Sequence, residues 1–380
     1  MKDVKLLMLK AVSVCNLQCS YCSAHCASKQ PAILDKDLTC QVLKELLDVL
    51  HPQPRELDIL WHGGEPTLFP ADKAKNLMQK MRNIANDYNT TLVFKMQTNG
   101  YSISEEWIQL FLDEDIALGI SIDGPDFIHD KARLDKNGSG SWNKVMANIE
   151  KLVNLGCKVS MLSVIDDRHT GHAKEYFEWL KSVHLPVRLN PYFDCSLRGQ
   201  SVWKQYFLFL RQLMELALQN DYDISITPLD NMIKRILSAK YMIGECSYSG
   251  YCARNFLCFG ADGMVSSCGR LSDNGGDKEI YKPGQLGELI KKFRSIIQNN
   301  IDERKLELHC MDCEIKSFCN GYCHAVKLDP ESGFCDAIRN FYSFLSSEAL
   351  SLIKQRVLRE KAKVQAKIAA IQQLMAEEVK

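Results

Sequence analysis

The stretch Val12–Cys26, VSVCNLQCSYCSAHC, places four cysteines within fifteen residues near the start of the chain. Three of them, Cys15, Cys19 and Cys22, form a C-x3-C-x2-C pattern directly after an apolar run that is typical of a strand. Structural zinc sites usually have four protein ligands, whereas three thiolates leave one iron of a four-iron cluster without a protein ligand. The pattern therefore favours an iron–sulfur cluster whose open iron can bind a small chelating molecule.

The cysteine content as a whole points to metal binding. The chain has 16 cysteines in 380 residues, and disulfide frameworks of that density belong to smaller secreted proteins, so we expect a reducing compartment, the cytoplasm. Four cysteines lie outside the metal-binding patterns and are interpreted as small buried side chains: Cys26, Cys40, Cys157 and Cys195.

The charge balance argues against nucleic acid and membranes as partners. The chain carries 47 basic and 47 acidic residues, so no phosphate-tracking surface is indicated. No uninterrupted apolar segment approaches the roughly 18 residues that a membrane span needs. The sequence therefore predicts neither kind of partner.

Apolar, β-branched runs alternate with amphipathic helical patterns in the first half of the chain, as in βα units. Strands are predicted at 4–13, 57–61, 91–97, 117–122, 158–165 and 187–192, and helices near 37–50, 70–88, 103–113, 143–155 and 172–183. This order predicts an α/β fold whose six parallel strands curl into a partial (β/α)6 TIM-type barrel. The motifs CNLQC, WHGGEP, QTNG and SIDGP follow strands, so we expect them to lie together at the carboxyl edge of the sheet.

The pattern changes after the sixth strand. We expect a barrel over 1–200, a helical bridging region over 201–245, a cysteine-rich region with little periodicity over 246–336, and a helical tail over 337–380. The bridging region contains one long helical stretch at 202–240. The tail has an apolar face that should pack on the core or on a second copy, with peptide binding as the alternative.

The segment CNLQCSYC, with its aromatic Tyr21, resembles the signature of radical S-adenosylmethionine (SAM) enzymes, and the resemblance extends through the whole predicted barrel. It implies a [4Fe–4S] cluster on Cys15, Cys19 and Cys22 whose free iron takes the amino and carboxylate groups of SAM. Reduction then releases a 5′-deoxyadenosyl radical. The chain is therefore expected to be an enzyme.

The same resemblance implies a SAM-binding surface at the strand ends. GGEP, Gly63–Pro66, resembles the segment that meets the SAM amino group, and Arg133 resembles the partner of the SAM carboxylate, for which a planar guanidinium is suited. The alternatives are an ordinary turn, a solvated arginine, and turn-stabilising side chains at Asn99 and Asp123. The candidate cofactor-binding residues are Tyr21, Gly63, Gly64, Glu65, Pro66, Asn99, Ser121, Asp123 and Arg133.

Eight later cysteines resemble the SPASM extension of radical SAM enzymes, which carries two auxiliary [4Fe–4S] clusters, so that three clusters are implied in total. The nearer auxiliary cluster would be held by Cys246, Cys252, Cys268 and Cys323. The farther one would be held by Cys310, Cys313, Cys319 and Cys335. A zinc ribbon is the alternative for the 310–323 run, and Cys258 could replace Cys252 as a ligand.

Two subfamilies carry this eight-cysteine pattern: maturases of ribosomally made precursor peptides and anaerobic sulfatase maturases, which make formylglycine. In the sulfatase type an acidic residue that serves as base follows the third nearer-cluster cysteine, whereas this chain has Gly269 there. We therefore favour a peptide maturase that installs an oxidative crosslink. A C–C cyclophane is favoured over a thioether as the product. A flavodoxin- or ferredoxin-type reductant is the expected redox partner. The catalytic base is not identifiable from the sequence, and a non-catalytic iron–sulfur electron carrier is the alternative of another class.

Overall fold

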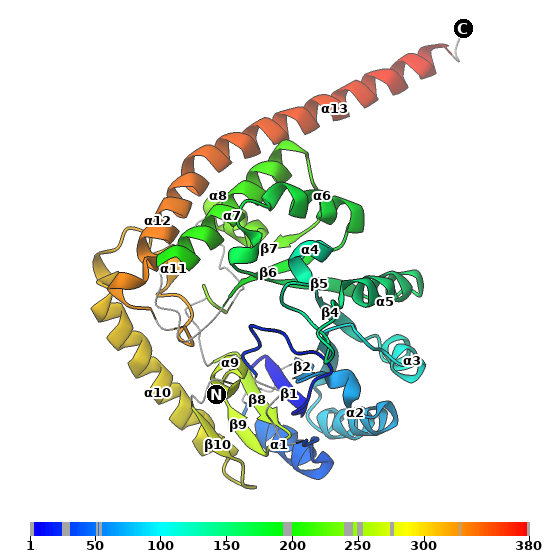
Figure 1. The fold of residues 1–380 in the computed structure, drawn as a ribbon, viewed down its shortest axis with the longest axis vertical. Helices are drawn as coiled ribbons and strands as arrows, with labels where there is room; N and C mark the ends of the chain where they lie inside the picture. Colours follow the sequence, from blue (N-terminus) through cyan, green and yellow to red (C-terminus); the bar gives the residue numbers. More distant parts are fainter. Residues whose placement is uncertain are drawn as a thin grey trace.

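The computed structural model describes residues 4–24, 31–50, 52, 55–192, 200–238, 246–248, 254–273, 277–326 and 328–377. Within these ranges the strands form one ten-stranded sheet in the order β10-β9-β8-β1-β2-β3-β4-β5-β6-β7 (Figure 1). The central strands are β1 (Leu6–Val12), β2 (Glu56–Gly63), β3 (Thr91–Thr98), β4 (Ala117–Ser121), β5 (Val159–Ile165) and β6 (Val187–Pro191). Each is parallel to the next, which confirms the predicted partial barrel.

Helices cover the outer face of this sheet. They are α1 (Lys36–Val49), α2 (Ala71–Asn86), α3 (Glu105–Asp113), the short α4 (Asp126–His129), α5 (Trp142–Asn154) and α6 (Ala173–Val183) (Figure 1). Every second strand residue is buried beneath them; Leu7, Leu9 and Trp61, for example, are fully buried. The opposite, inner face carries half-buried and more polar side chains, so buried and half-buried residues alternate along each strand. In a parallel sheet that is packed on both faces, the strands would instead be apolar throughout.

The inner face of β1 to β4 is the surface on which the site is built. It carries Met8, Lys10, His62, Gln97 and Ser121, and the register places Lys10 beside His62 on the neighbouring strand. Lys10 interrupts an otherwise apolar strand, which is unusual in a parallel sheet. Charged and polar groups therefore lie on the inner side of the sheet, close to its carboxyl edge.

The cysteine-rich region joins the same sheet. Strand β8 (Phe256–Gly260) pairs parallel with β1, from Leu6 beside Phe256 to Lys10 beside Gly260. β9 (Met264–Ser266) and β10 (Lys278–Ile280) continue antiparallel from it, whereas β7 (Ile226–Thr227) extends the other edge beside β6. The sequence interpretation missed these four short strands. They join the cysteine-rich region directly to the strand that precedes the first cysteine cluster.

The later helices differ from the prediction in two places. They are α7 (Gln200–Gln219), α8 (Leu229–Leu237), α9 (Gly269–Asp273), α10 (Leu286–Glu307), α11 (Lys316–Cys319), α12 (Phe334–Phe344) and α13 (Leu350–Glu377). The single helical stretch predicted over 202–240 is wrong, because a turn at Asp221, whose φ is 51°, and strand β7 separate α7 from α8. The 22-residue α10 was also missed.

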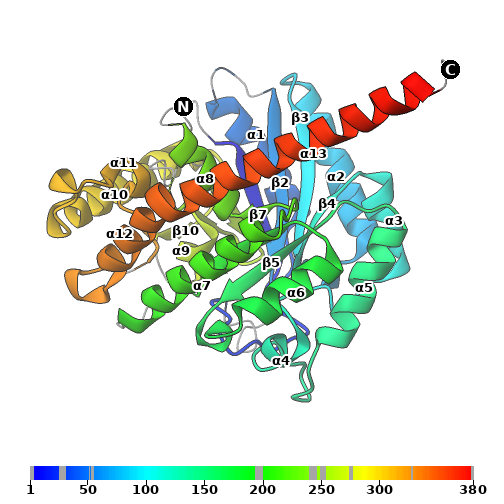
Figure 2. The same cartoon turned by 90° about the horizontal axis from the view of Figure 1, so that it is seen from above.

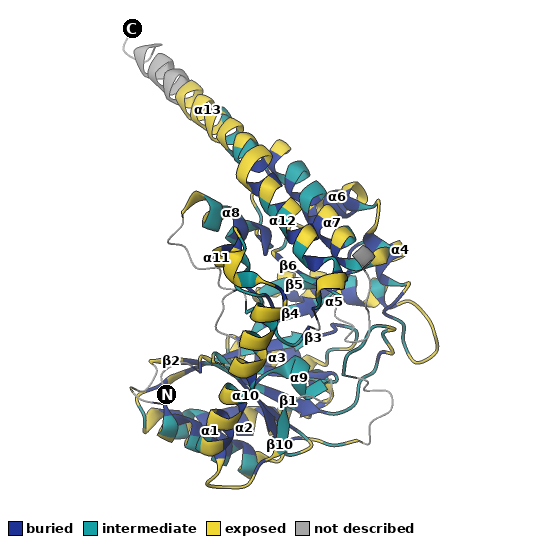
Figure 3. Cartoon of the chain, turned by 90° about the vertical axis from the view of Figure 1, so that its left-hand side faces the viewer, coloured by how far each residue is buried: buried dark blue, intermediate teal, exposed yellow. Residues whose placement is uncertain are grey.

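The tail is helical, as predicted, and projects from the body (Figure 3). α7, α12 and the start of α13 pack together (Figure 2), and Arg359 of α13 donates to Asp221 Oδ1 at 2.8 Å. Val357 and Val364, which lie on either side of Arg359 in the sequence, are exposed. Among the described helices, none combines the length and the hydropathy that a bilayer span requires.

Candidate active site

The loop that carries Cys15, Cys19 and Cys22, residues 13–22, is held from two sides. On one side the amides of Gly64 and Glu65 donate to the carbonyls of Val12 and Val14, at 2.8 and 3.0 Å. On the other side the amide of Gln18 donates to Leu134 O and that of Ser20 to Ala132 O, at 2.8 and 3.0 Å. These bonds fix the cluster loop against the GGEP segment and against residues 132–134.

The three thiols of the cluster loop lie within electrostatic range of one another, although no three side chains among the described residues are already spaced to hold a metal ion. Burial raises the pKa of Cys15 to about 11, and the neighbouring Glu65, Cys19 and Cys22 add to that increase. Burial also raises the pKa of Cys19, against the effect of the adjacent Arg133 guanidinium. Thiols that hold their protons this firmly when unliganded need a strong cationic partner to become thiolates, as metal binding provides.

The two glycines of GGEP are required by the cluster loop itself. Gly63 has a φ of +131°, which favours glycine, and a Cβ there would lie 2.6 Å from Val12 O. A Cβ on Gly64 would lie 1.9 Å from Val14 O. Any larger residue would push the cluster loop away from the end of β2, so these glycines are explained by backbone packing.

Glu65 connects the ends of β2 and β3. Its fully buried carboxylate accepts hydrogen bonds from Thr67 N and Thr67 Oγ1, from Thr98 Oγ1 at 2.6 Å, and from Asn99 N at 2.7 Å. The Asn99 side chain in turn donates to Asn16 Oδ1 at 2.7 Å and to Cys15 Sγ at 3.5 Å. In this structure Glu65 positions Asn99, and Asn99 steadies the cluster loop.

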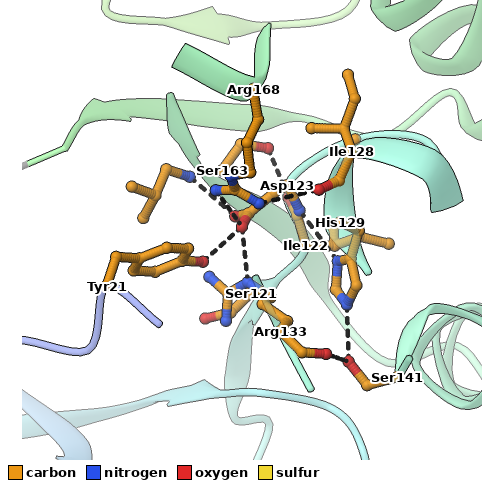
Figure 4. Close-up of polar contacts among 12 residues, drawn as sticks. Tyr21, Ser121, Ile122, Asp123, Ile128, His129, Arg133, Ser141, Ser163 and Arg168 are labelled. Carbon is orange, nitrogen blue, oxygen red and sulfur yellow. Dashed lines mark hydrogen bonds and ion pairs between the residues drawn. The ribbon is translucent and has the colours of Figure 1, made fainter. Parts of the chain in front are cut away.

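Asp123 is the centre of a buried charge network (Figure 4). Its Oδ2 accepts from Tyr21 Oη and lies 3.1 Å from both Arg133 Nε and Arg168 Nη2, while Oδ1 accepts from the amide of Val164 at 3.0 Å. Burial would raise the pKa of Asp123, but the two guanidiniums hold it well below its usual range. The carboxylate is therefore ionised and fixed at the end of β4.

The aromatic ring of Tyr21 lies between the same two arginines. The guanidinium carbons of Arg133 and Arg168 are 5.3 and 5.1 Å from its ring centre, within the range of cation–π contacts. Arg133 contacts Asp123 through Nε, at ion-pair distance but outside hydrogen-bond geometry. The two Nη atoms of Arg133 take no part in this contact. They form the planar pair of donors that matches a carboxylate.

The structure thus brings the candidate cofactor-binding residues into two neighbouring groups. Tyr21, Asp123 and Arg133 form one group, and Gly63, Gly64, Glu65 and Asn99 form the other around the cluster loop. Pro66 is buried as the first residue of a short 3-10 turn, and Ser121 accepts from Gln97 Nε2 at 2.9 Å.

The sequence interpretation missed the partner of Asp123 that follows the next strand. Arg168 donates through Nε to Asp166 and through Nη1 to Ile128 O, so its guanidinium is fixed on all sides. Arg168 could have been predicted from the sequence, because it belongs to the polar motif DDRH. This motif follows β5 and therefore lies at the same edge of the sheet as the other motifs. Lys10 and His62 were also missed, because a charge inside a strand and a histidine before GGEP were not interpreted as parts of the site.

The farther auxiliary cysteines lie in one region of the structure. Burial raises the pKa of Cys319 to about 12, and the charges of Cys335, Cys310 and Cys313 raise it further, so these three thiols lie within electrostatic range of Cys319. Arg339 Nη2 lies 3.8 Å from Cys313 Sγ. A guanidinium therefore stands at the edge of this group.

Three of the four cysteines predicted to hold the nearer auxiliary cluster, Cys246, Cys268 and Cys323, are among the described residues. Arg270 Nη1 donates to Cys323 Sγ at 3.5 Å, and the charges of Cys323 and Cys268 both act on its guanidinium. Cys258 is buried in β8, where burial raises its pKa to about 12 and Cys268 is among its neighbours. Cys252 lies outside the described residues, as do Cys26 and Cys195, so their assignments stay predictions.

Residues 10–180 match the Radical SAM superfamily. The protein therefore contains a radical SAM domain and, like its relatives, is an enzyme, so the non-catalytic carrier is set aside. Such a domain implies a [4Fe–4S] cluster and SAM.

Several relatives that match over most of the chain are sulfatase-maturating enzymes. A cysteine-type anaerobic sulfatase-maturating enzyme of Clostridium novyi is 25% identical over 395 residues, covering 95% of this chain and 100% of that protein. A serine-type enzyme of Bacteroides thetaiotaomicron is 24% identical over 400 residues, with 94% and 92% covered.

Solved structures share the fold. Native anSMEcpe with bound AdoMet and Cp18Cys peptide superposes with a TM-score of 0.76 at 20% identity, covering 93% of this chain and 99% of that one. Streptococcus suis SuiB bound to precursor peptide SuiA has a TM-score of 0.60 at 13% identity, with 86% and 73% covered. The chain is thus related to sulfatase maturases over nearly its whole length and has the fold of a peptide maturase.

Proposed function

We propose that this protein oxidises a peptide substrate by two electrons, using SAM and three [4Fe–4S] clusters. The observation that carries the proposal is the fixed loop that presents Cys15, Cys19 and Cys22 beside the buried network of Tyr21, Asp123 and Arg133. Three thiols and an adjacent guanidinium fit a cluster with one open iron and a carboxylate-bearing ligand.

The residues divide the work as follows. Cys15, Cys19 and Cys22 would hold the cluster, and the Nη fork of Arg133 would hold the SAM carboxylate. When bound, the cluster and SAM supply a 5′-deoxyadenosyl radical that removes hydrogen from carbon. Asp123 and Arg168 fix Arg133 and Tyr21 by charge and hydrogen bonds, so the ligand meets a rigid surface.

The favoured reaction is the formation of an oxidative crosslink in a ribosomally made precursor peptide. The product is more readily a cyclophane than a thioether. Two proteins of similar fold have been solved with bound peptides: SuiB with the precursor peptide SuiA, and anSMEcpe with the Cp18Cys peptide. This supports a peptide substrate. A flavodoxin- or ferredoxin-type protein would supply the reducing electron.

The second candidate is formylglycine formation, which the near-complete coverage of the sulfatase-maturating relatives favours. Gly269 weighs against it, because a glycine takes no proton. A Cβ at this position would lie 2.7 Å from Met8 Sδ, so a side chain here would have to displace the end of the Met8 side chain.

The reaction can be identified with defined peptides. The chain is co-expressed with each short peptide encoded beside its gene. Separately, the purified and anaerobically reconstituted chain is incubated with the Cp18Cys peptide, SAM and reductant. Loss of H2 from a co-expressed peptide by mass spectrometry supports crosslinking, and conversion of the Cp18Cys cysteine to an aldehyde supports the second candidate. If neither peptide changes, the protein is not a peptide maturase of these types.

Arg270 should set the reduction potential of the nearer auxiliary cluster. A guanidinium that donates to a ligand sulfur favours the reduced, more negative cluster. In Arg270→Gln we expect the midpoint potential to fall by roughly 40 mV, which corresponds to about 1 kcal/mol for one electron. Redox titration followed by EPR measures this value. Arg211→Gln, which removes a surface arginine that pairs with Glu215, is the control and should leave every potential unchanged.

A further inference from the structure

A buried ion pair lies on the inner face of the sheet, outside the network around Asp123. Lys10 Nζ donates to Gly269 O at 3.0 Å and contacts the carboxylate of Asp273, and their side chains are only 12% and 9% exposed. Taking two charges out of water costs several kcal/mol. A pair of well-packed apolar residues at these positions would usually make the fold at least as stable as the ion pair does. The pair therefore needs an explanation other than stability.

Its position lies between the two cysteine regions. Helix α9 starts directly after Cys268 and lies against the inner face of β1, since a Cβ on Gly269 would be 2.7 Å from Met8 Sδ. Two residues after Lys10, β1 ends at Val12 and leads into the cluster loop. Lys10 therefore lies near the end of the strand that leads to Cys15, and Asp273 lies on the short helix that begins directly after Cys268.

His62 faces the same place. Lys10 and His62 are register neighbours on β1 and β2. The amide of Gly63 donates to His62 Nδ1 at 2.8 Å, so the proton of the neutral ring is on Nε2. Burial lowers the pKa of His62, and Lys10 lowers it further, so the ring is neutral near pH 7. It can therefore offer a hydrogen bond from Nε2–H.

The carboxylate of Asp273 retains one acceptor. Oδ1 is used by Lys10, whereas no donor from the described residues reaches Oδ2, and Oδ2 is not among the atoms buried without a partner. A carboxylate with one oxygen anchored and one available has the geometry of a proton acceptor.

We infer that Asp273 is the base of the peptide oxidation, held by Lys10, with His62 positioning the substrate. The inference rests on the proposed function. In forming a new bond, the peptide gives one hydrogen atom to the 5′-deoxyadenosyl radical. The second hydrogen leaves as a proton to Asp273 Oδ2, and its electron passes to an oxidised auxiliary cluster, so atoms and electrons balance.

The test compares Asp273→Asn with Asp262→Asn, which removes an exposed carboxylate from the β8–β9 turn of the same sheet. The probes are the Cp18Cys peptide and the co-expressed peptide encoded beside the gene. With the peptide that the wild-type enzyme modifies, we expect Asp273→Asn to form 5′-deoxyadenosine at a rate near wild type but at least tenfold less modified peptide. Freeze-quench EPR should then show more substrate radical. Asp262→Asn should resemble wild type in all three measurements.

A double variant separates catalysis from structure. Lys10→Met/Asp273→Asn removes both charges, so unfolding in urea should occur nearer the wild-type midpoint than in either single variant. If the pair is only structural, this variant also recovers peptide modification, and the inference fails. The inference equally fails if Asp273→Asn modifies the peptide at the wild-type rate, or forms no 5′-deoxyadenosine with its clusters intact. If the wild-type enzyme modifies neither probe, the proposed function fails instead.

Discussion

The Cys19→Ala variant should form no detectable 5′-deoxyadenosine from SAM and reductant. Cys19 is the central thiol of the cluster loop, beside both Arg133 and Cys22. Two remaining thiols cannot hold a four-iron cluster at three irons. Iron analysis of the anaerobically reconstituted chain should fall from about 12 irons to about 8.

The control for this loss is another half-buried cysteine. Cys157 lies just before β5, away from the cluster loop, and only burial perturbs its pKa. Cys157→Ala should keep both the iron content and the cleavage of SAM. Full 5′-deoxyadenosine formation by Cys19→Ala would contradict the assignment of the cluster ligands.

The Asp123→Asn variant should be destabilised by about 3–5 kcal/mol, because two buried guanidiniums lose their shared counter-charge. Arg133 and Arg168 are both within 3.1 Å of the carboxylate that the variant removes. Urea unfolding followed by tryptophan fluorescence measures the change. Glu105→Gln breaks an exposed pair with Lys151 and should change the free energy of unfolding by less than about 1 kcal/mol.

The same network predicts the sign of a pH effect. The pKa of Asp123 is lower in the folded protein than its ordinary value of about 3.9, so the stabilisation is present above that value. It is lost only as the pH falls through the depressed folded pKa. Between pH 7 and 5 the stability difference between wild type and Asp123→Asn should therefore stay constant. A difference that disappears over this interval would contradict the charge network.

The barrel could be predicted from the sequence because its strands and helices have different periods. Alternating or continuous apolar runs marked β1 to β6, and the apolar spacing of 3.6 residues marked the helices between them. The strand ends then had to share one edge, which is why Tyr21, Asp123 and Arg133 were expected together and do meet.

The missed elements are short or lay in a region interpreted by its cysteines. β9 and β10 have three residues each, too few to show a period. α10 did carry a signal, since the buried Leu286, Leu289, Ile290, Phe293 and Ile297 follow helical spacing, but the cysteine spacing dominated the interpretation. Propensity alone also continued α7 through Asp221, because the turn there depends on a left-handed residue.

The polar partners within the site depend on contacts between distant residues. Lys10 meets Asp273 across 263 positions, and Arg168 meets Asp123 across 45. A sequence shows which residue types are present, but the pairing follows only from strand register and from how α9 lies on β1. This explains why the cysteines and glycines could be proposed as site residues from their spacing while Lys10, His62 and Arg168 were not.

The parallel ladder between β1 and β8 also bears on electron transfer. Because β1, which leads to Cys15, pairs with β8 of the region that contains Cys268, the two regions cannot swing apart without breaking backbone hydrogen bonds. Tunnelling rates decay steeply with distance, so a fixed gap between redox centres gives a constant hopping time. The sheet thus acts as a rigid spacer between the two regions.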